Sequence, residues 1–166
     1  TRPWVEHWAL AQPRRKLHAC CGYLHSAVDA AGQLRRQLGG DLGHGEVEVH
    51  VPAYTADAVS KQRPPLSAND ARFHLQFCLA LVLCGADVIE PAHSIDYSTH
   101  LAREDVTHAM ARIRVVVDPA LTHYQQCRVV VRGQGVELGA CTLEAPRGSP
   151  SSPLTDAEVV AKFLRL

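Results

Sequence analysis

Long apolar runs and an excess of charge of one sign are both missing from this 166-residue sequence. The longest apolar stretch, residues 79–84, is far shorter than the ~20 residues that a membrane-spanning helix needs. The 17 basic residues are balanced by 17 acidic ones, whereas a nucleic-acid-binding domain needs a basic surface to contact phosphates. The sequence therefore predicts a protein that binds neither a membrane nor nucleic acid.

Methionine is scarce as well, since Met110 is the single one and the chain begins at Thr1. We therefore expect a chain that was processed or cut from a longer one. The basic triplet at 14–16 is not followed by the apolar segment of a secretory signal. With 46% hydrophobic and 20% charged residues, the composition is that of an ordinary globular domain, long enough to bury its own core.

The six cysteines are an even number, which is compatible with disulfides. However, Cys78, Cys84, Cys127 and Cys141 all fall in apolar patterns, and a chain of this length needs no covalent staples. We expect six free thiols that are buried like other small hydrophobic residues. Free thiols are typical of the reducing cytoplasm, which is the location that we predict.

Apolar periodicity predicts a mixture of helices and strands. Helices are expected at 23–38, 68–84, 104–110 and from 155 to the end, with a helical turn at 55–60. Ser67 and Thr155 begin capping boxes, and 86–103 is ambiguous between short helix and loop. Strands are expected at 46–51, 113–117, 127–131 and 136–143, the last two joined as a hairpin through the Gly-rich link at 133–135.

This order of elements predicts the α+β class, with a mainly antiparallel sheet and helices packed on one of its faces. The helices at 23–38 and 68–84 are expected to contact the sheet through Leu34, Phe73 and Phe77. Residues 1–13 carry Trp4 and Trp8 between prolines, and we interpret them as an edge segment that docks through its aromatic rings. The domain itself is expected to span 14–166.

Chemistry-bearing residues gather just before the first predicted helix, whereas P-loop, HExxH and GxSxG motifs are absent from the sequence. This segment contains Arg14, Arg15, Lys16, His18, Cys20, Cys21 and His25. Helix N-termini favour anions, and nearby cations add charge-assisted bonds to carboxylates. Asp29 lies four residues after His25, so the two share a helix face and could hold the imidazole in one tautomer for acid–base chemistry.

Less specific interpretations of this segment stay open. A basic triplet is also typical of a solvated loop, and a histidine with a carboxylate four residues away is also typical of a surface pair. Zinc could use His18, Cys20, Cys21 and His25, but vicinal cysteines lack the two-residue gap of common zinc knuckles. We therefore predict no metal and no organic cofactor.

The same segment resembles a block of the MmgE/PrpD family, which includes 2-methylcitrate dehydratase, cis-aconitate decarboxylase and iminodisuccinate epimerase. Three further blocks resemble the family in the same order along the chain. The four are residues 16–30 (KLHACCGYLHSAVDA), 69–77 (NDARFHLQF), 111–118 (ARIRVVVD) and 146–163, which begins PRGSP. Together they cover about 14–166, and they depart from the family pattern at Arg72, His74 and Gln76.

The resemblance implies that this chain is only the smaller, C-terminal α+β domain of a longer enzyme. In the family a large helical domain supplies the other wall of the active site. On the motif match, Lys16 and His25 are the catalytic residues. From its charge, the neighbouring Arg15 is expected to join them in binding the substrate. The implied enzyme is a cofactor-independent lyase or isomerase that acts on a small di- or tricarboxylic acid and is inactive without its helical domain.

A second hypothesis is that the chain is a free-standing, non-catalytic binding or interaction module that kept this fold. Under either hypothesis, the surface that meets the helical domain in the family is expected to be apolar and exposed here. Such patches favour self-association, so we expect a homodimer or a larger homo-oligomer.

Overall fold

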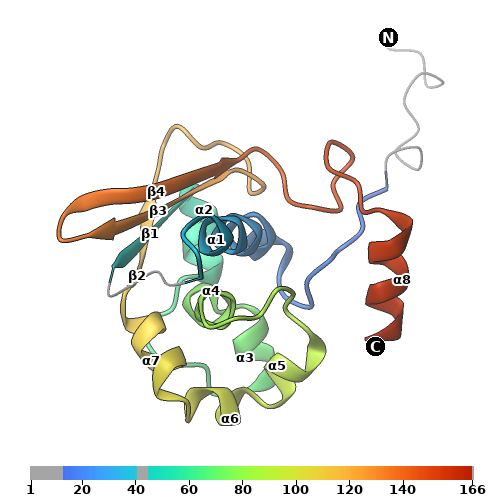
Figure 1. Ribbon diagram of the computed structural model, residues 1–166, viewed down its shortest axis with the longest axis horizontal. Coiled ribbons are helices and arrows are strands. Elements are labelled where there is room, and N and C mark those ends of the chain that lie inside the picture. The colour runs from blue at the N-terminus through green and yellow to red at the C-terminus, as the bar shows by residue number, and fades with distance from the viewer. Residues whose placement is uncertain (1–12, 41–44, 166) are drawn as a thin grey trace.

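The computed structural model describes residues 13–40 and 45–165 of the chain, so the expected edge segment lies outside the described residues except for Pro13. Figure 1 shows the arrangement of the elements. In chain order they are α1 (His25–Gln37), β1 (Glu46–Val51), α2 (Ala53–Val59), α3 (Ala68–Arg72), α4 (Leu75–Leu83), α5 (Pro91–Ile95), α6 (Tyr97–Leu101), α7 (Glu104–Ala111), β2 (Ile113–Val117), β3 (Cys127–Gly133), β4 (Val136–Leu143) and α8 (Asp156–Leu164).

The four strands form one sheet in the order β2-β1-β3-β4. β1 pairs antiparallel with β3, and β3 with β4, which confirms the predicted α+β fold with a mainly antiparallel sheet. β1 and β2 are parallel, because residues 52–112 leave β1 and return so that β2 runs beside it in the same direction. The β3–β4 hairpin turns on Gln134 and Gly135, both with positive φ, as a type I′ turn requires.

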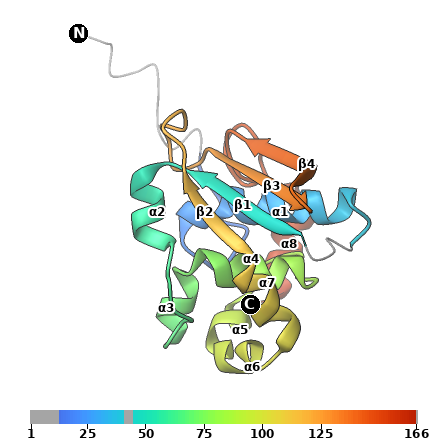
Figure 2. The ribbon, with the colours of Figure 1, turned by 90° about the vertical axis from the view of Figure 1, so that its left-hand side faces the viewer.

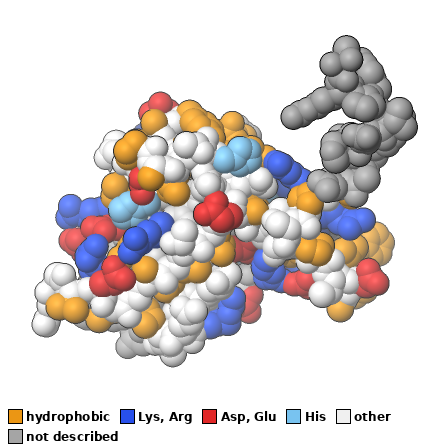
Figure 3. All heavy atoms as spheres, turned by 90° about the horizontal axis from the view of Figure 1, so that it is seen from above, with side chains coloured by type: hydrophobic (Ala, Val, Ile, Leu, Met, Phe, Trp, Pro, Cys, Tyr) orange, Lys and Arg blue, Asp and Glu red, His pale blue; other side chains and the backbone are white. Residues whose placement is uncertain are grey.

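Helices cover one face of the sheet in two layers, as Figures 1 and 2 show. α1 lies against β3 and β4, and α4 lies against α1 and α7 while also touching β2. Leu34 of α1 and Phe77 of α4 are each 1% exposed, as their predicted packing requires. The opposite face of the sheet carries ion pairs, such as Arg114–Glu46 at 3.2 Å, and Figure 3 shows basic and acidic side chains next to one another there.

The predicted helix at 68–84 is two helices rather than one. The backbone is extended at His74, whose ring Nδ1 accepts a hydrogen bond from the Phe77 N–H and so caps the start of α4. The break turns Phe73 outward, where it is 42% exposed, so the prediction that Phe73 packs in the core is wrong. The preceding helix, α3, begins as predicted at Ser67, whose hydroxyl accepts the Asp70 N–H.

The remaining helices are close to their predicted places. The first predicted helix opens with a 3₁₀ turn at Gly22–Leu24 before α1, and the ambiguous 86–103 region forms α5 and α6. The capping box at Thr155 is present and begins α8. Figure 1 shows α8 apart from the two helical layers, and its Phe163 and Leu164 are 76% and 77% exposed. In the described part of the chain, none of the helices combines the length and apolarity needed to cross a bilayer.

Candidate active site

The basic triplet at 14–16 is fixed against a turn far along the chain. The Arg15 N–H donates to the Gly148 carbonyl at 2.8 Å. Gly148 has a φ of 87°, and a Cβ there would lie 1.8 Å from the Arg15 carbonyl oxygen. Only glycine permits this approach, so residue 148 determines how closely the triplet and the 146–149 turn come together.

Lys16 and His25, the two predicted catalytic residues, line the pocket that this approach creates. Its volume is about 110 Å³, and its walls also include Arg15, Tyr124 and Arg147. The Lys16 ammonium folds back over the next turn, where it donates to the Cys20 carbonyl at 3.4 Å. The pocket therefore brings together all three of the residues that the sequence proposed for substrate binding.

One ring nitrogen of His25 has no hydrogen-bond partner among the residues that the structure describes. It is the first residue of α1 and 3% exposed, and its Nε2 forms no hydrogen bond within the described residues. A buried polar atom without a partner is costly. The same residue borders the basic pocket, which makes its imidazole a candidate partner for a ligand bound there.

Within the described residues, Arg147 is the cation of this pocket that a carboxylate neutralises. Arg147 forms an ion pair with Glu158, and Arg14 donates to the Tyr124 hydroxyl and stacks over that ring. Among residues 13–40 and 45–165, no carboxylate pairs with Arg15 or Lys16. The unpaired positive charge of the pocket therefore comes from Arg15, Lys16 and also Arg14, because Tyr124 is uncharged.

A buried pair behind His25 organises the site, and it differs from the pairing that the helix spacing suggested. Asp29 bonds His18 rather than His25, at 3.0 Å from its Oδ1 to the ring Nε2. The other oxygen of Asp29 accepts the Arg147 N–H at 2.8 Å, while His18 Nδ1 accepts the Ile89 N–H at 3.2 Å. The neutral His18 ring therefore carries its proton on Nε2, and Asp29 joins α1 to both segments that form the pocket.

The expected His25–Asp29 pair is thus wrong because the carboxylate is consumed by closer partners. The His18 and His25 rings meet edge to face, with centroids 5.2 Å apart. Sequence reasoning placed His18 among the candidate zinc ligands only. Within the described residues no group of three or more His, Cys, Asp or Glu side chains is arranged to hold a metal ion.

The profile of the MmgE/PrpD C-terminal domain matches residues 18–166. The chain belongs to the MmgE/PrpD family. No curated protein matches the chain. The family match includes His25 and the His18–Asp29 pair, whereas Arg15 and Lys16 lie just before its first residue. The resemblance inferred from the four sequence blocks is therefore confirmed at the level of the family and of its C-terminal domain.

Two buried thiols of this MmgE/PrpD domain, Cys20 and Cys127, are unsuited to nucleophilic chemistry. All six cysteines are free, as predicted. The contact of the Cys20 thiol with Cys78, together with burial, stabilises the protonated form and raises the pKa of Cys20 well above its ordinary value. Burial also raises the pKa of Cys127. Since the thiolate is the reactive form, Cys20 is a packing residue although it lies close to His25.

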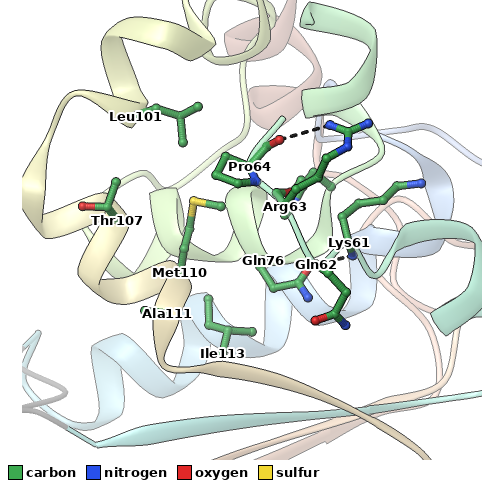
Figure 4. A pocket seen from close by; sticks show the side chains of 11 residues that line it. Lys61, Gln62, Arg63, Pro64, Gln76, Leu101, Thr107, Met110, Ala111 and Ile113 are labelled. Carbon is green, nitrogen blue, oxygen red and sulfur yellow. Dashed lines mark hydrogen bonds between the residues drawn. The ribbon is translucent and has the colours of Figure 1, made fainter. Parts of the chain in front are cut away.

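A larger hollow of about 340 Å³ lies elsewhere, between the 61–64 loop, α4, α6, α7 and β2. Figure 4 shows Leu101, Met110 and Ile113 along one side of it, and the long Lys61 side chain extending away from them. The Gln76 amide there already accepts the Lys61 N–H and donates to Ser60. The polar side chains of Gln76, His74 and Thr107 in this hollow are thus already bonded within the protein, and the basic pocket remains the candidate active site.

Proposed function

We propose that the chain is the α+β half of a cofactor-independent lyase or isomerase that acts on small di- or tricarboxylic acids. The observation that carries this proposal is that one pocket is lined by Arg15 and Lys16, which no carboxylate pairs with among the described residues, and by His25, whose buried Nε2 has no hydrogen-bond partner there. A carboxylate matches both features, because it accepts hydrogen bonds and carries the opposite charge.

The expected reaction begins with removal of a proton from the carbon atom next to a substrate carboxylate. This removal builds negative charge on the carboxylate oxygens as an enediolate forms, and fixed cations lower the energy of that state. Lys16 would act there, with Arg15 holding the ligand in place. His25 would donate a hydrogen bond to the ligand or move a proton to or from it.

We propose that this chain has no turnover alone. In the family the other wall of the active site belongs to a helical domain, and acid–base groups act only when they are held in fixed positions opposite one another. The exposed apolar residues of α8, Val160, Phe163 and Leu164, support a contact with such a domain. In its absence they support the proposed self-association. The six free thiols support a cytoplasmic location.

The test is restoration of activity by the helical domain of a family member, added in trans or as a fusion. The isolated chain should not convert 2-methylcitrate, citrate or cis-aconitate, whereas the restored enzyme should convert one of them. In the restored enzyme, Lys16→Ala should lower kcat by about 100-fold, as loss of one stabilising group does elsewhere, and His25→Ala by about 100-fold.

Two exposed residues outside the pocket provide matched controls, since Arg36→Ala also removes one cation and His108→Ala one histidine. Both controls should leave kcat unchanged. Turnover by the isolated chain would overturn the two-domain proposal. Normal kcat in both pocket variants would overturn the assignment of Lys16 and His25, and a restored assembly that binds carboxylates without converting them would favour the non-catalytic module.

A further inference from the structure

A second hollow adjoins the basic pocket and shares Lys16 with it. Its volume is about 520 Å³, and α3, the start of α5 and α8 contribute to it. Lys16 donates to the carbonyl of Cys20, which borders this second hollow. A Cβ at Gly22, which borders the first pocket, would lie 3.9 Å from Lys16 Cε. The Lys16 side chain therefore lies on the ridge between the two hollows.

Arg72 lines the second hollow, and a hydrogen bond from its Nε fixes the position of its guanidinium. Its Nε donates to the hydroxyl of Ser94 at 3.0 Å, and the buried Ser94 in turn donates to the Pro91 carbonyl at 2.9 Å. The backbone carbonyl of Arg72 accepts the Cys21 N–H at 2.9 Å, which joins α3 to the segment that carries Lys16. The guanidinium is thus oriented by the fold although its side chain is exposed.

The terminal nitrogens of Arg72 are left for a ligand. In the described part of the chain, neither Nη atom has a hydrogen-bond partner and no carboxylate pairs with the guanidinium. These two nitrogens form a planar fork that matches a carboxylate in a bidentate manner. Lys162 also lines the hollow and donates from its ammonium to the Lys16 carbonyl, and none of the described residues that line it is an Asp or Glu.

We propose that Arg72 anchors a second carboxylate of the substrate, so that the ligand crosses the Lys16 ridge with one carboxylate in each hollow. This inference rests on the proposed function, since it takes the first carboxylate to lie beside Arg15 and His25. Phe73, exposed at the edge of the second hollow, borders the chain that links the two carboxylates. The site is therefore selective for di- and tricarboxylates over monocarboxylates, and Arg72 is the specificity-determining residue.

The test compares two probes on the 166-residue chain by calorimetric titration at constant ionic strength. Tricarballylate carries carboxylates for both hollows, and propionate carries only one. The chain should bind tricarballylate about tenfold or more tightly than propionate. Arg72→Gln should remove that advantage while leaving the propionate Kd unchanged, and Arg72→Lys should retain part of it because an ammonium lacks the fork.

The control Arg36→Gln removes an exposed cation of α1 and should change neither Kd. Matching thermal unfolding of the Arg72→Gln variant and the parent chain would exclude a folding defect. Equal losses for both probes, or no loss for tricarballylate, would overturn the role of Arg72 while leaving the first site intact. If neither probe binds the parent chain, the proposed function itself fails and this inference fails with it.

Discussion

Asp29→Ala removes only a small side chain, but it should lower the free energy of unfolding of this domain by a large amount. The carboxylate accepts two hydrogen bonds, at 3.0 Å from His18 and at 2.8 Å from the Arg147 N–H. Bonds to a charged group contribute ~1.5–3 kcal/mol each, and both donors would be left without an acceptor. We expect the free energy of unfolding to fall by about 3–5 kcal/mol, a large part of the ~5–15 kcal/mol of a typical domain.

Urea unfolding followed by circular dichroism measures this loss, with the m-value checked for constancy. Asp57→Ala is the matched control, because Asp57 is an exposed residue of α2, and it should change the free energy by less than about 0.5 kcal/mol. Asp29→Asn should also destabilise the domain. The amide NH₂ group would face one of the two N–H groups that now donate to the carboxylate, and two donors cannot bond each other. If Asp29→Ala costs no more than Asp57→Ala, the buried linkage behind the pocket is wrong.

Three further predictions address pH, backbone geometry and thiols. Burial lowers the pKa of three histidines, namely His74, His93 and His100. Below pH ~6.5 the unfolded chain therefore binds more protons than the folded one. The free energy of unfolding should be highest above that pH and fall as the pH drops from 6.5 to 5. An equal urea midpoint at pH 7.5 and 5.0 would contradict this. Gly148→Ala should lower the free energy of unfolding by at least about 2 kcal/mol. Gly40 also has a positive φ but has open space around it, so Gly40→Ala should lower the free energy by about 1 kcal/mol. Comparable unfolding curves for the two variants would refute the close approach at residue 148. Thiol titration in denaturant should find six free thiols, and a smaller number would reveal a disulfide.

The strands were predictable because each has a local signal. Val47, Val49 and Val51 alternate with polar residues and are buried as that alternation requires. The parallel pairing of β1 with β2 was not predictable in this way, since it depends on the route of residues 52–112. Likewise the break before α4 has no glycine or proline to mark it, because it is made by the His74 side chain.

Two local signals could have improved the sequence prediction. Pro91 follows Glu90 and precedes His93, and these residues begin α5 with a proline in its first turn and a capping box. Proline in the first turn is a recognised start signal for helices. Gln134-Gly135 was predicted as part of a three-residue link, although a two-residue turn ending in glycine suits a hairpin better.

Part of the candidate pocket could be named from the sequence, but its hydrogen-bond partners and its distant residues could not. Lys16 and His25 could be named because a contiguous motif carries them. The choice of His18 rather than His25 as the partner of Asp29 depends on a loop that brings residue 18 back over α1. Arg147 and Tyr124 enter the pocket from turns more than 90 residues away along the chain, and helical periodicity contains no information about such contacts.

The most direct measurement of the central claim is a titration of the ¹⁵N-histidine-labelled chain with tricarballylate, followed by NMR. If a carboxylate binds beside Arg15, Lys16 and His25, the His25 Nε2 signal should shift with saturation while the exposed His108 stays unchanged. Lys16→Ala should weaken that response by about tenfold. An unchanged His25 signal, or an equal response in the Lys16→Ala chain, would contradict the assignment of this pocket as the carboxylate site.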